Sequence, residues 1–308
     1  MAHEAPVPHI VVVGSTMIDL STYVDLLPER GQTVVGERFM LGYGGKGANQ
    51  AVMAARLGAR VTFVNCVGDD LFGEMVRKNL GDRGIDVSRV KTVKSESTGV
   101  AAIWVERDGM NRIVITPGAN YALSAADVWA ELADVAPAHC VICQLEIGHE
   151  AVAAALRWGR ACEAVTILNP APAAALDEEL LDLVDWLVPN ETEFELLFGA
   201  PADDASLLRF DALLSGGLVV TLGDRGAAIV VAGEAITCPA PEVEAIDTTG
   251  AGDAFVGGLA YALARGETIV SAVTFANWCG AQSTTRYGTQ TSFPDAAAAI
   301  PEAGPLRT

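Results

Sequence analysis

Positive charge is scarce in this sequence of 308 residues. Lysine and arginine together number 20, against 39 aspartate and glutamate residues, so the formal net charge is −19. A surface field of this sign repels phosphate backbones and anionic lipid head groups. We therefore expect no nucleic-acid partner and no membrane partner. A bound nucleotide would need a local site of backbone N–H groups and Mg²⁺.

Long apolar runs and regular cysteine spacing are also missing. The first residues, MAHEAPVPHIVVVG, lack the basic stretch and apolar length of a secretory signal, and no later segment is long enough to span a bilayer. A cytoplasmic location is expected. The six cysteines form no disulfide framework. Cys140 and Cys143 have CxxC spacing but lie in an apolar strand-like stretch, so we expect no metal or redox role.

Short apolar runs alternate with helical patterns along most of the chain. HIVVVG, VTFVNCVG, CVICQLEI and GLVVTLG have the pattern of buried strands, whereas ANQAVMAARLG and AVAAALRWGR have helical spacing. This order predicts an α/β fold with a doubly wound, mainly parallel sheet and helices on both faces, that is, three α/β/α layers.

Two stretches, 18–41 and 98–117, interrupt this alternation. The second has the pattern of two strands, with Asp108 and Gly109 at the turn. We expect these stretches to form a small β-sheet lid on an α/β core of residues 1–17, 42–97 and 118–308. A lid would close over a substrate and exclude water. The alternative is a pair of additional core strands.

The strongest motif is IDTTGAGDAFVGGLAYALARG, residues 246–266. Helical spacing of apolar residues begins after Asp253, which places Gly250, Ala251 and Gly252 in a turn at a helix N-terminus. Backbone N–H groups and the helix dipole stabilise negative charge there, so these three residues are predicted to form an anion hole. Asp253 is predicted to be a catalytic base that accepts a hydroxyl proton. The alternative is an ordinary acid at a helix start.

A second glycine turn, GYGGKGANQAVMAARLGA (42–59), also leads into a helix. It is not a P-loop, because glycine follows Lys46 where Ser or Thr is required. Its bare backbone would suit a sugar, with Lys46 and Asn49 donating to hydroxyls. Asp19 and Glu146 follow strands, and an open α/β sheet binds ligands at the ends of its strands. Asp19 and Glu146 are therefore expected to bind the sugar; the alternative is that they are solvated acids of loops.

The same turn permits a different function. Gly42, Gly44 and Gly47 match the G-x-G-x-x-G dinucleotide fingerprint, and Asp69 and Asp70 follow at about the expected distance. A nicotinamide-dependent oxidoreductase is therefore the alternative from another class. The fingerprint normally ends the first core strand, here HIVVVG, which GSTMID follows without the required glycines.

Six motifs taken together carry a resemblance. With GGKGANQA, CQLE, NPAPA, PNETE, TLGDRG and DTTGAGD in this order, the chain resembles the ribokinase-like (PfkB) carbohydrate kinases from about Ile10 to Pro294. The resemblance implies an α/β/α core with a β-sheet lid, a homodimer through the lids, and the use of ATP, Mg²⁺ and a monovalent cation, usually K⁺. It also implies phosphorylation of a small sugar, with ribose O5 as the expected acceptor. A non-catalytic sugar sensor on the same fold is a further alternative, which an intact Asp253 disfavours.

The resemblance also assigns residues, position by position. The acceptor sugar would contact Asp19, Gly45, Lys46, Asn49, Glu146 and Asp253. Phosphate, Mg²⁺ and ATP would be bound by Asn190, Glu193, Thr221, Gly223 and Asn277. The K⁺ loop would use, largely through backbone carbonyls, Asp247, Thr249, Ser283, Arg286, Gly288 and Ser292.

One position departs from the family's pattern. Bacterial ribokinases often carry Asn two residues before this aspartate, whereas this sequence has Met17 before Asp19. Ribokinases with Met here also exist, and deoxyribokinases resemble the same pattern. A site with one fewer polar partner rejects 2-deoxyribose less strongly, so Met17 is predicted to relax selectivity at the 2-position of the sugar.

Overall fold

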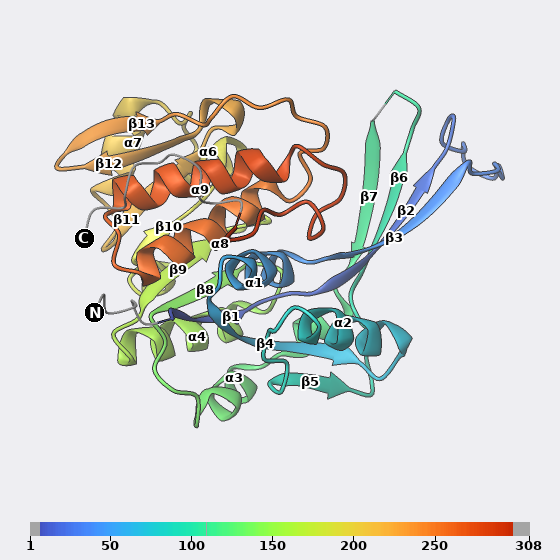
Figure 1. Cartoon of the computed structure of the whole chain (residues 1–308), viewed down its shortest axis with the longest axis horizontal. Helices are drawn as coiled ribbons and strands as arrows, with labels where there is room; N and C mark the ends of the chain where they lie inside the picture. Colours follow the sequence, from blue (N-terminus) through green and yellow to red (C-terminus); the bar gives the residue numbers. More distant parts are fainter. Residues whose placement is uncertain (1–6, 109, 298–308) are drawn as a thin grey trace.

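The computed structural model describes residues 7–108 and 110–297, which form two β-sheets (Figure 1). The larger sheet has nine strands in the order β13-β12-β11-β10-β9-β8-β1-β4-β5. Its neighbours are parallel from β5 to β11, and β12 and β13 are antiparallel additions at one edge. The strands are β1 (His9–Val13), β4 (Arg60–Gly68), β5 (Val90–Val93), β8 (Cys140–Gln144), β9 (Val165–Asn169), β10 (Trp186–Leu187), β11 (Gly217–Thr221), β12 (Ala227–Val231) and β13 (Glu234–Cys238).

Helices cover both faces of this sheet. One layer contains α1 (Lys46–Arg56), α2 (Leu71–Gly81), α8 (Ala251–Ala264) and α9 (Ile269–Ser283). The other contains α3 (Ala125–Leu132), α4 (His149–Ala161), α5 (Glu178–Leu181), α6 (Glu191–Phe198) and α7 (Asp204–Asp211). The three-layer α/β/α fold with a mainly parallel sheet is therefore confirmed.

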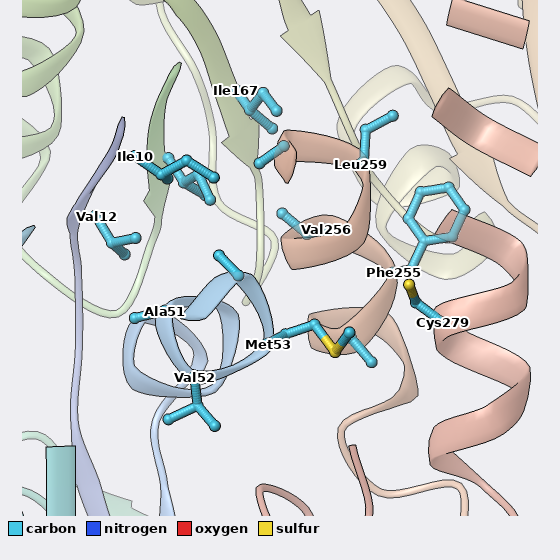
Figure 2. Packing of buried hydrophobic residues seen from close by; sticks show 14 of the residues in the cluster. Ile10, Val12, Ala51, Val52, Met53, Ile167, Phe255, Val256, Leu259 and Cys279 are labelled. Atoms are coloured by element: carbon cyan, nitrogen blue, oxygen red, sulfur yellow. The ribbon is translucent and has the colours of Figure 1, made fainter. Parts of the chain in front are cut away.

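Strand β1, in the interior of the sheet, is an apolar run because both of its faces are buried. Ile10 and Val12 belong to the core on one face of the sheet, Val11 and Val13 belong to the core on the other face, and all four are fully buried. A parallel strand covered on both faces has no solvent side for polar residues. Figure 2 shows the first of these cores, in which side chains of α1, α8 and α9 pack together.

The CxxC pair lies within β8. Cys140 packs into the core on one face of the sheet and Cys143 into the core on the other face, and both are free thiols. Side chains three residues apart in a strand point to opposite faces. The two sulfur atoms therefore cannot share a metal ion or form a disulfide.

A four-stranded sheet in the order β3-β2-β6-β7 projects from the core (Figure 1). Its strands are β2 (Met17–Tyr23), β3 (Arg38–Gly44), β6 (Val100–Val105) and β7 (Asn111–Thr116). The turn expected at Asp108 and Gly109 joins β6 to β7; Asp108 accepts a hydrogen bond from the Met110 N–H (3.0 Å), and Gly109 lies outside the described residues.

The pairing of β2 with β3 extends this sheet beyond the ranges expected from the sequence. Met17 pairs with Gly44, and Asp19 pairs with Gly42. Strand β3 therefore continues three residues past position 41, and β2 begins one residue before position 18. Residues 1–6 and 298–308 of the expected core lie outside the described residues.

The dinucleotide fingerprint does not fit this structure. Gly42 and Gly44 lie in β3 of the projecting sheet, not in a turn that follows a strand of the core. Asp70 is the N-cap of α2, where its carboxylate accepts from the Gly73 N–H (2.8 Å). The interpretation is wrong because the strand that leads into this turn and α1 belongs to the small sheet and pairs antiparallel, whereas a dinucleotide site is built on a parallel strand of the core.

Within residues 7–108 and 110–297, none of the helices combines the length and the hydrophobicity that crossing a membrane requires.

Candidate active site

Polar residues gather at the carboxyl ends of the parallel strands. Ser15 follows β1, Glu146 follows β8, Asn169 ends β9, Asn190 follows β10 and Thr221 ends β11. Parallel strands end at the same edge of the sheet, so the fold brings together residues that are far apart in the sequence.

Two helices begin at this edge with a glycine in the left-handed region. Gly45 precedes α1 with φ 86°, and Gly250 precedes α8 with φ 79°. A Cβ atom would lie 2.5 Å from the Thr16 Cα at Gly45 and 2.3 Å from the Thr289 Cγ2 at Gly250. In neither helix does the N-cap residue supply a side-chain cap. At the start of α1 the Lys46 and Gly47 N–H groups donate to Glu146 and Ser15, whereas the first turn of α8 leaves N–H groups available for an anion.

A cavity of about 200 Å³ lies at the N-terminus of α8. Several residues singled out in the sequence line it together, as do four that were not. The predicted ones are Lys46, Asn190, Glu193, Thr221, Gly250, Ala251, Gly252 and Asp253. The others are Asn169, Val188, Thr248 and Val256.

Asp253 is the third residue of α8 and is buried, with 8% of its surface exposed. Its carboxylate accepts from Asn49 Nδ2 (2.8 Å) and Gln50 Nε2 (3.0 Å), both in α1, and does not cap its own helix. Asp253 is thus an acid of the first helical turn whose carboxylate contacts the amides of α1 and not the backbone N–H groups of its own helix. Burial raises the pKa of Asp253, while Lys46 and the two amides act in the opposite direction.

Acidic groups surround Lys46 at the start of α1. The Glu146 carboxylate accepts from Ser15 Oγ (2.5 Å) and from the Lys46 backbone N–H (2.9 Å). Burial alone would lower the pKa of the Lys46 ammonium, but the carboxylates of Asp253, Glu146 and Glu193 raise it. Lys46 therefore remains a cation within this group of carboxylates.

Asp19 lies in β2 against the backbone of Gly44. A Cβ atom at Gly44 would lie 2.4 Å from Asp19 Oδ1, so glycine leaves the space for this carboxylate. Burial, followed by repulsion from Glu146 and Asp253, raises the pKa of Asp19 to about 6. Asp19 therefore gains a proton just below neutral pH, far above the usual range for an aspartate.

Of the residues assigned to phosphate and ATP, Asn190 and Glu193 lie together at a helix start, whereas Gly223 and Asn277 lie elsewhere. Asn190 and Glu193 form a capping box at the start of α6: Asn190 Oδ1 accepts from the Glu193 N–H (2.8 Å) and Glu193 Oε2 from the Asn190 N–H (2.9 Å). Burial raises the pKa of Glu193. Gly223 has φ 63° and open space beside its Cα. Asn277 is buried and is not among the residues lining the cavity, and its Nδ2 donates to the Cys238 carbonyl (2.7 Å).

The residues assigned to a monovalent cation come from three neighbouring segments. Asp247 joins two of them, because its carboxylate accepts from the Thr249 N–H (3.0 Å) and the Gly288 N–H (3.0 Å). These bonds lower the pKa of Asp247 against the effect of burial. Ser283 and Ser292 are buried and donate to nearby backbone carbonyls, whereas Arg286 is exposed. Among the described residues there is no group of three or more His, Cys, Asp or Glu side chains arranged to hold a metal ion.

Sequence reasoning missed four buried amides around Asp253, namely Gln50, Gln144, Asn169 and Gln290. Three of them left a signal in the sequence, since Asn169 is the first residue of the NPAPA motif. Gln50 lies within the GGKGANQA motif, and Gln144 is a polar residue inside the apolar run CVICQ. A polar side chain in a fully buried strand needs hydrogen-bond partners, but the sequence does not say where they are.

Comparison with known proteins agrees with this fold and identifies a family. Residues 7–296 match the family model described as pfkB family carbohydrate kinase. The deoxyribokinase of Salmonella typhi is 40% identical over 291 residues, covering 92% of this chain and 95% of the relative. Mouse ribokinase is 40% identical over 295 residues, covering 92% of this chain and 91% of the relative. A solved structure of Arabidopsis thaliana ribokinase complexed with ribose and ATP has a TM-score of 0.87 at 30% identity, covering 96% of this chain and 98% of that chain. The chain therefore belongs to the pfkB family of carbohydrate kinases.

Proposed function

We propose that this protein transfers the γ-phosphoryl group of ATP to O5 of D-ribose, giving D-ribose 5-phosphate, with 2-deoxyribose as a second acceptor. The observation that carries the proposal is the buried Asp253 carboxylate beside the uncapped Gly250–Gly252 turn in one cavity. Relatives named ribokinase and deoxyribokinase at 40% identity support both acceptors.

In the proposed reaction Asp253 accepts the proton of the O5 hydroxyl as the bond from O5 to phosphorus forms. The bond from phosphorus to the bridging oxygen of ADP breaks, and ADP leaves with that electron pair. N–H groups of the Gly250–Gly252 turn donate to the migrating phosphoryl group. The sugar is held by Asp19, Gly45, Lys46, Asn49 and Glu146.

The residues present also fit ATP with Mg²⁺. Glu193 is one of the acidic residues that line the cavity, and Mg²⁺ in kinases is usually held by one or two carboxylates together with substrate phosphates. We assign Asn190 and Glu193 to this ion and the phosphates, and Thr221, Gly223 and Asn277 to the nucleotide. When bound, Mg²⁺ would neutralise charge on the phosphate oxygens.

A monovalent cation such as K⁺ fits the segment that Asp247 ties together. The donor set is one carboxylate with hydroxyls and backbone carbonyls, all hard oxygen ligands that suit such an ion. We assign the site to Asp247, Thr249, Ser283, Arg286, Gly288 and Ser292, with Arg286 contributing only its carbonyl.

The proposed function is tested by measuring ADP release with ribose, 2-deoxyribose and a panel of hexoses and nucleosides, with K⁺ titrated in each case. Ribose and 2-deoxyribose should give the highest kcat/KM. A preference for a hexose or a nucleoside would contradict the assignment of the acceptor. Absence of ADP release with every sugar would contradict the kinase itself.

Met17 provides a prediction about selectivity between the two acceptors. Met17 and Asp19 lie on the same face of β2, two residues apart, and Met17 is 3% exposed opposite Gly44. Met17→Asn places a polar group there that pairs with the 2-hydroxyl. The ratio of kcat/KM for ribose to that for 2-deoxyribose should rise roughly tenfold or more. An unchanged ratio would show that Met17 does not influence selectivity.

The raised pKa of Asp19 predicts the pH dependence of sugar capture. The ionised carboxylate accepts two hydroxyl hydrogen bonds, and the protonated form loses that capacity. We expect kcat/KM for ribose to fall as the pH drops through about 6. Profiles between about pH 5 and 8 for the wild type and for Asp19→Asn check this. A wild-type profile that is flat around that pH would argue against the role of Asp19.

We further propose that the expected lid, residues 18–41 and 98–117, acts together with the paired residues 17 and 42–44 as a lid and that two chains pair through it. Strands β3 and β7 are the edges of the small sheet, and each exposes consecutive large apolar residues, namely Phe39, Met40, Leu41, Ile113, Val114 and Ile115. Apolar edge strands are sites for pairing with another chain. Sedimentation analysis tests the homodimer, and a monomer at assay concentrations would contradict it.

A further inference from the structure

A chain of side-chain amides reaches Asp253 from α2. Asn79 Nδ2 donates to Gln290 Oε1 (2.9 Å), Gln290 Nε2 donates to Asn49 Oδ1 (3.0 Å), and Asn49 Nδ2 donates to Asp253 Oδ2 (2.8 Å). All four residues are buried, with no more than 8% of their surface exposed. Three successive hydrogen bonds therefore connect the carboxylate to a helix with no residue lining the cavity.

A second chain reaches the other oxygen of the same carboxylate. Gln144 Nε2 donates to Gln50 Oε1 (2.6 Å), and Gln50 Nε2 donates to Asp253 Oδ1 (3.0 Å) and to Asn169 Oδ1 (3.2 Å). Gln144 and Gln50 are fully buried. Each carboxylate oxygen thus receives one amide donor from its own chain.

The direction of every amide in both chains is fixed by the carboxylate. An ionised carboxylate only accepts hydrogen bonds, so Asn49 and Gln50 must present their NH₂ groups to Asp253. Their carbonyl oxygens then face outward and require donors, which Gln290 and Gln144 supply. If one amide were reversed, its carbonyl oxygen would face another acceptor on one side and its NH₂ group would face another donor on the other side.

The packing of α1 against α8 does not require the buried amides. Helices α1 and α8 already meet through close apolar contact, since a Cβ atom at Gly257 would lie 2.6 Å from the Met53 Cβ. Buried amides gain little net stability over apolar side chains of the same shape, and an unsatisfied one is costly. Gln144 Oε1 has no hydrogen-bond partner among the described residues, so this cost is present here.

We infer that Gln50 and Gln290 are positioning residues, which act through the two amide chains to hold Asp253 ionised and aimed into the cavity. The inference rests on the proposed function, because it assigns to the amides the task of orienting the base of that reaction. The amides leave the remaining lone pairs of the carboxylate for the sugar hydroxyl. Gln290 does this without touching Asp253, because its effect passes through Asn49.

Two substitutions at Gln290 separate this role from packing. Gln290→Met keeps the volume but removes the donor to Asn49. Gln290→Glu also keeps the volume, but its carboxylate forces Asn49 to turn its NH₂ group outward and its carbonyl oxygen toward Asp253. We expect kcat to fall about tenfold in Gln290→Met and roughly 100-fold in Gln290→Glu. Gln50→Met, which removes a direct donor, should resemble the second of these.

The pH dependence of kcat distinguishes a positioning role from a structural one, because a substitution that only weakens packing would not change the pKa of Asp253. Gln50→Met removes a donor to the ionised carboxylate, and the Gln290 variants release or turn the Asn49 donor. Each change favours the protonated form of Asp253, so the acid limb of kcat should shift to higher pH in each variant. The matched control is Thr166→Val, which removes a fully buried hydroxyl that donates to the Leu183 carbonyl (2.7 Å) away from Asp253. It should lower Tm without moving the acid limb.

The possible results are distinguishable. A wild type that phosphorylates no sugar would overturn the proposed function rather than the role of the amides. An active wild type whose Gln290→Met and Gln50→Met variants keep kcat and the acid limb unchanged would overturn the positioning role. The two Met variants decide the question even if Gln290→Glu does not fold.

Discussion

Asp253→Asn is expected to lower kcat for ribose phosphorylation by about 10³-fold while leaving the KM for ATP within about twofold. Asparagine has nearly the same size, so the cavity keeps its volume, although its NH₂ group replaces one of the two oxygens that accept from Asn49 and Gln50. It cannot take the proton from the O5 hydroxyl, and it carries no charge to attract that proton. Steady-state ADP release measures kcat and both KM values, and equilibrium binding of ribose should show that the variant still holds the sugar.

Asp127→Asn is a matched control for this change. Asp127 is the third residue of α3, as Asp253 is of α8, but it forms a capping box with Ser124 and an ion pair with Lys91 (2.5 Å). Its replacement should reduce stability by about 1 kcal/mol and leave kcat unchanged. If the Asp253 variant retained kcat within tenfold of the wild type, Asp253 would not be the base.

Much of the core could be predicted from the sequence because buried elements have a recognisable pattern of apolar residues. The run HIVVV shows a strand covered on both faces, and Gly250 marks the start of a helix, although that helix begins at Ala251 and so already includes Gly252 and Asp253. These features depend on residues close together in the chain. The same locality explains why Lys46 and Asp253 could be singled out before the cavity that they share was known.

Contacts between segments that are distant in the chain have no comparable pattern in the sequence. The register that places Met17 opposite Gly44 moves residues 42–44 into the small sheet, and no local pattern specifies it. The amides of Asn49 and Gln290 are separated by 241 residues, and those of Gln50 and Gln144 by 94. A buried glutamine indicates that a partner exists, but many amides in the sequence could satisfy it.

Gly252→Ala should abolish most activity without harming the fold. A Cβ atom added at Gly252 meets no protein atom within 4 Å, although Gly252 lines the cavity. The new methyl group would therefore occupy space assigned to the migrating phosphoryl group. A displacement of about 1 Å at the reacting atoms can cost roughly 100-fold, so we expect kcat to fall by at least that factor.

Stability should change in the opposite sense. Alanine is favoured over glycine in a helix by up to about 1 kcal/mol, so the Tm of Gly252→Ala should equal or exceed that of the wild type. Gly81→Ala makes the same change in α2, where the nearest atom to the new Cβ is Val87 Cγ2 at 3.9 Å, and should leave kcat unaltered. An anion bound to the N–H groups at the start of α8 could not share the space with the new methyl group. A stable Gly252→Ala variant with wild-type kcat would therefore mean that the phosphoryl group is not transferred at this turn.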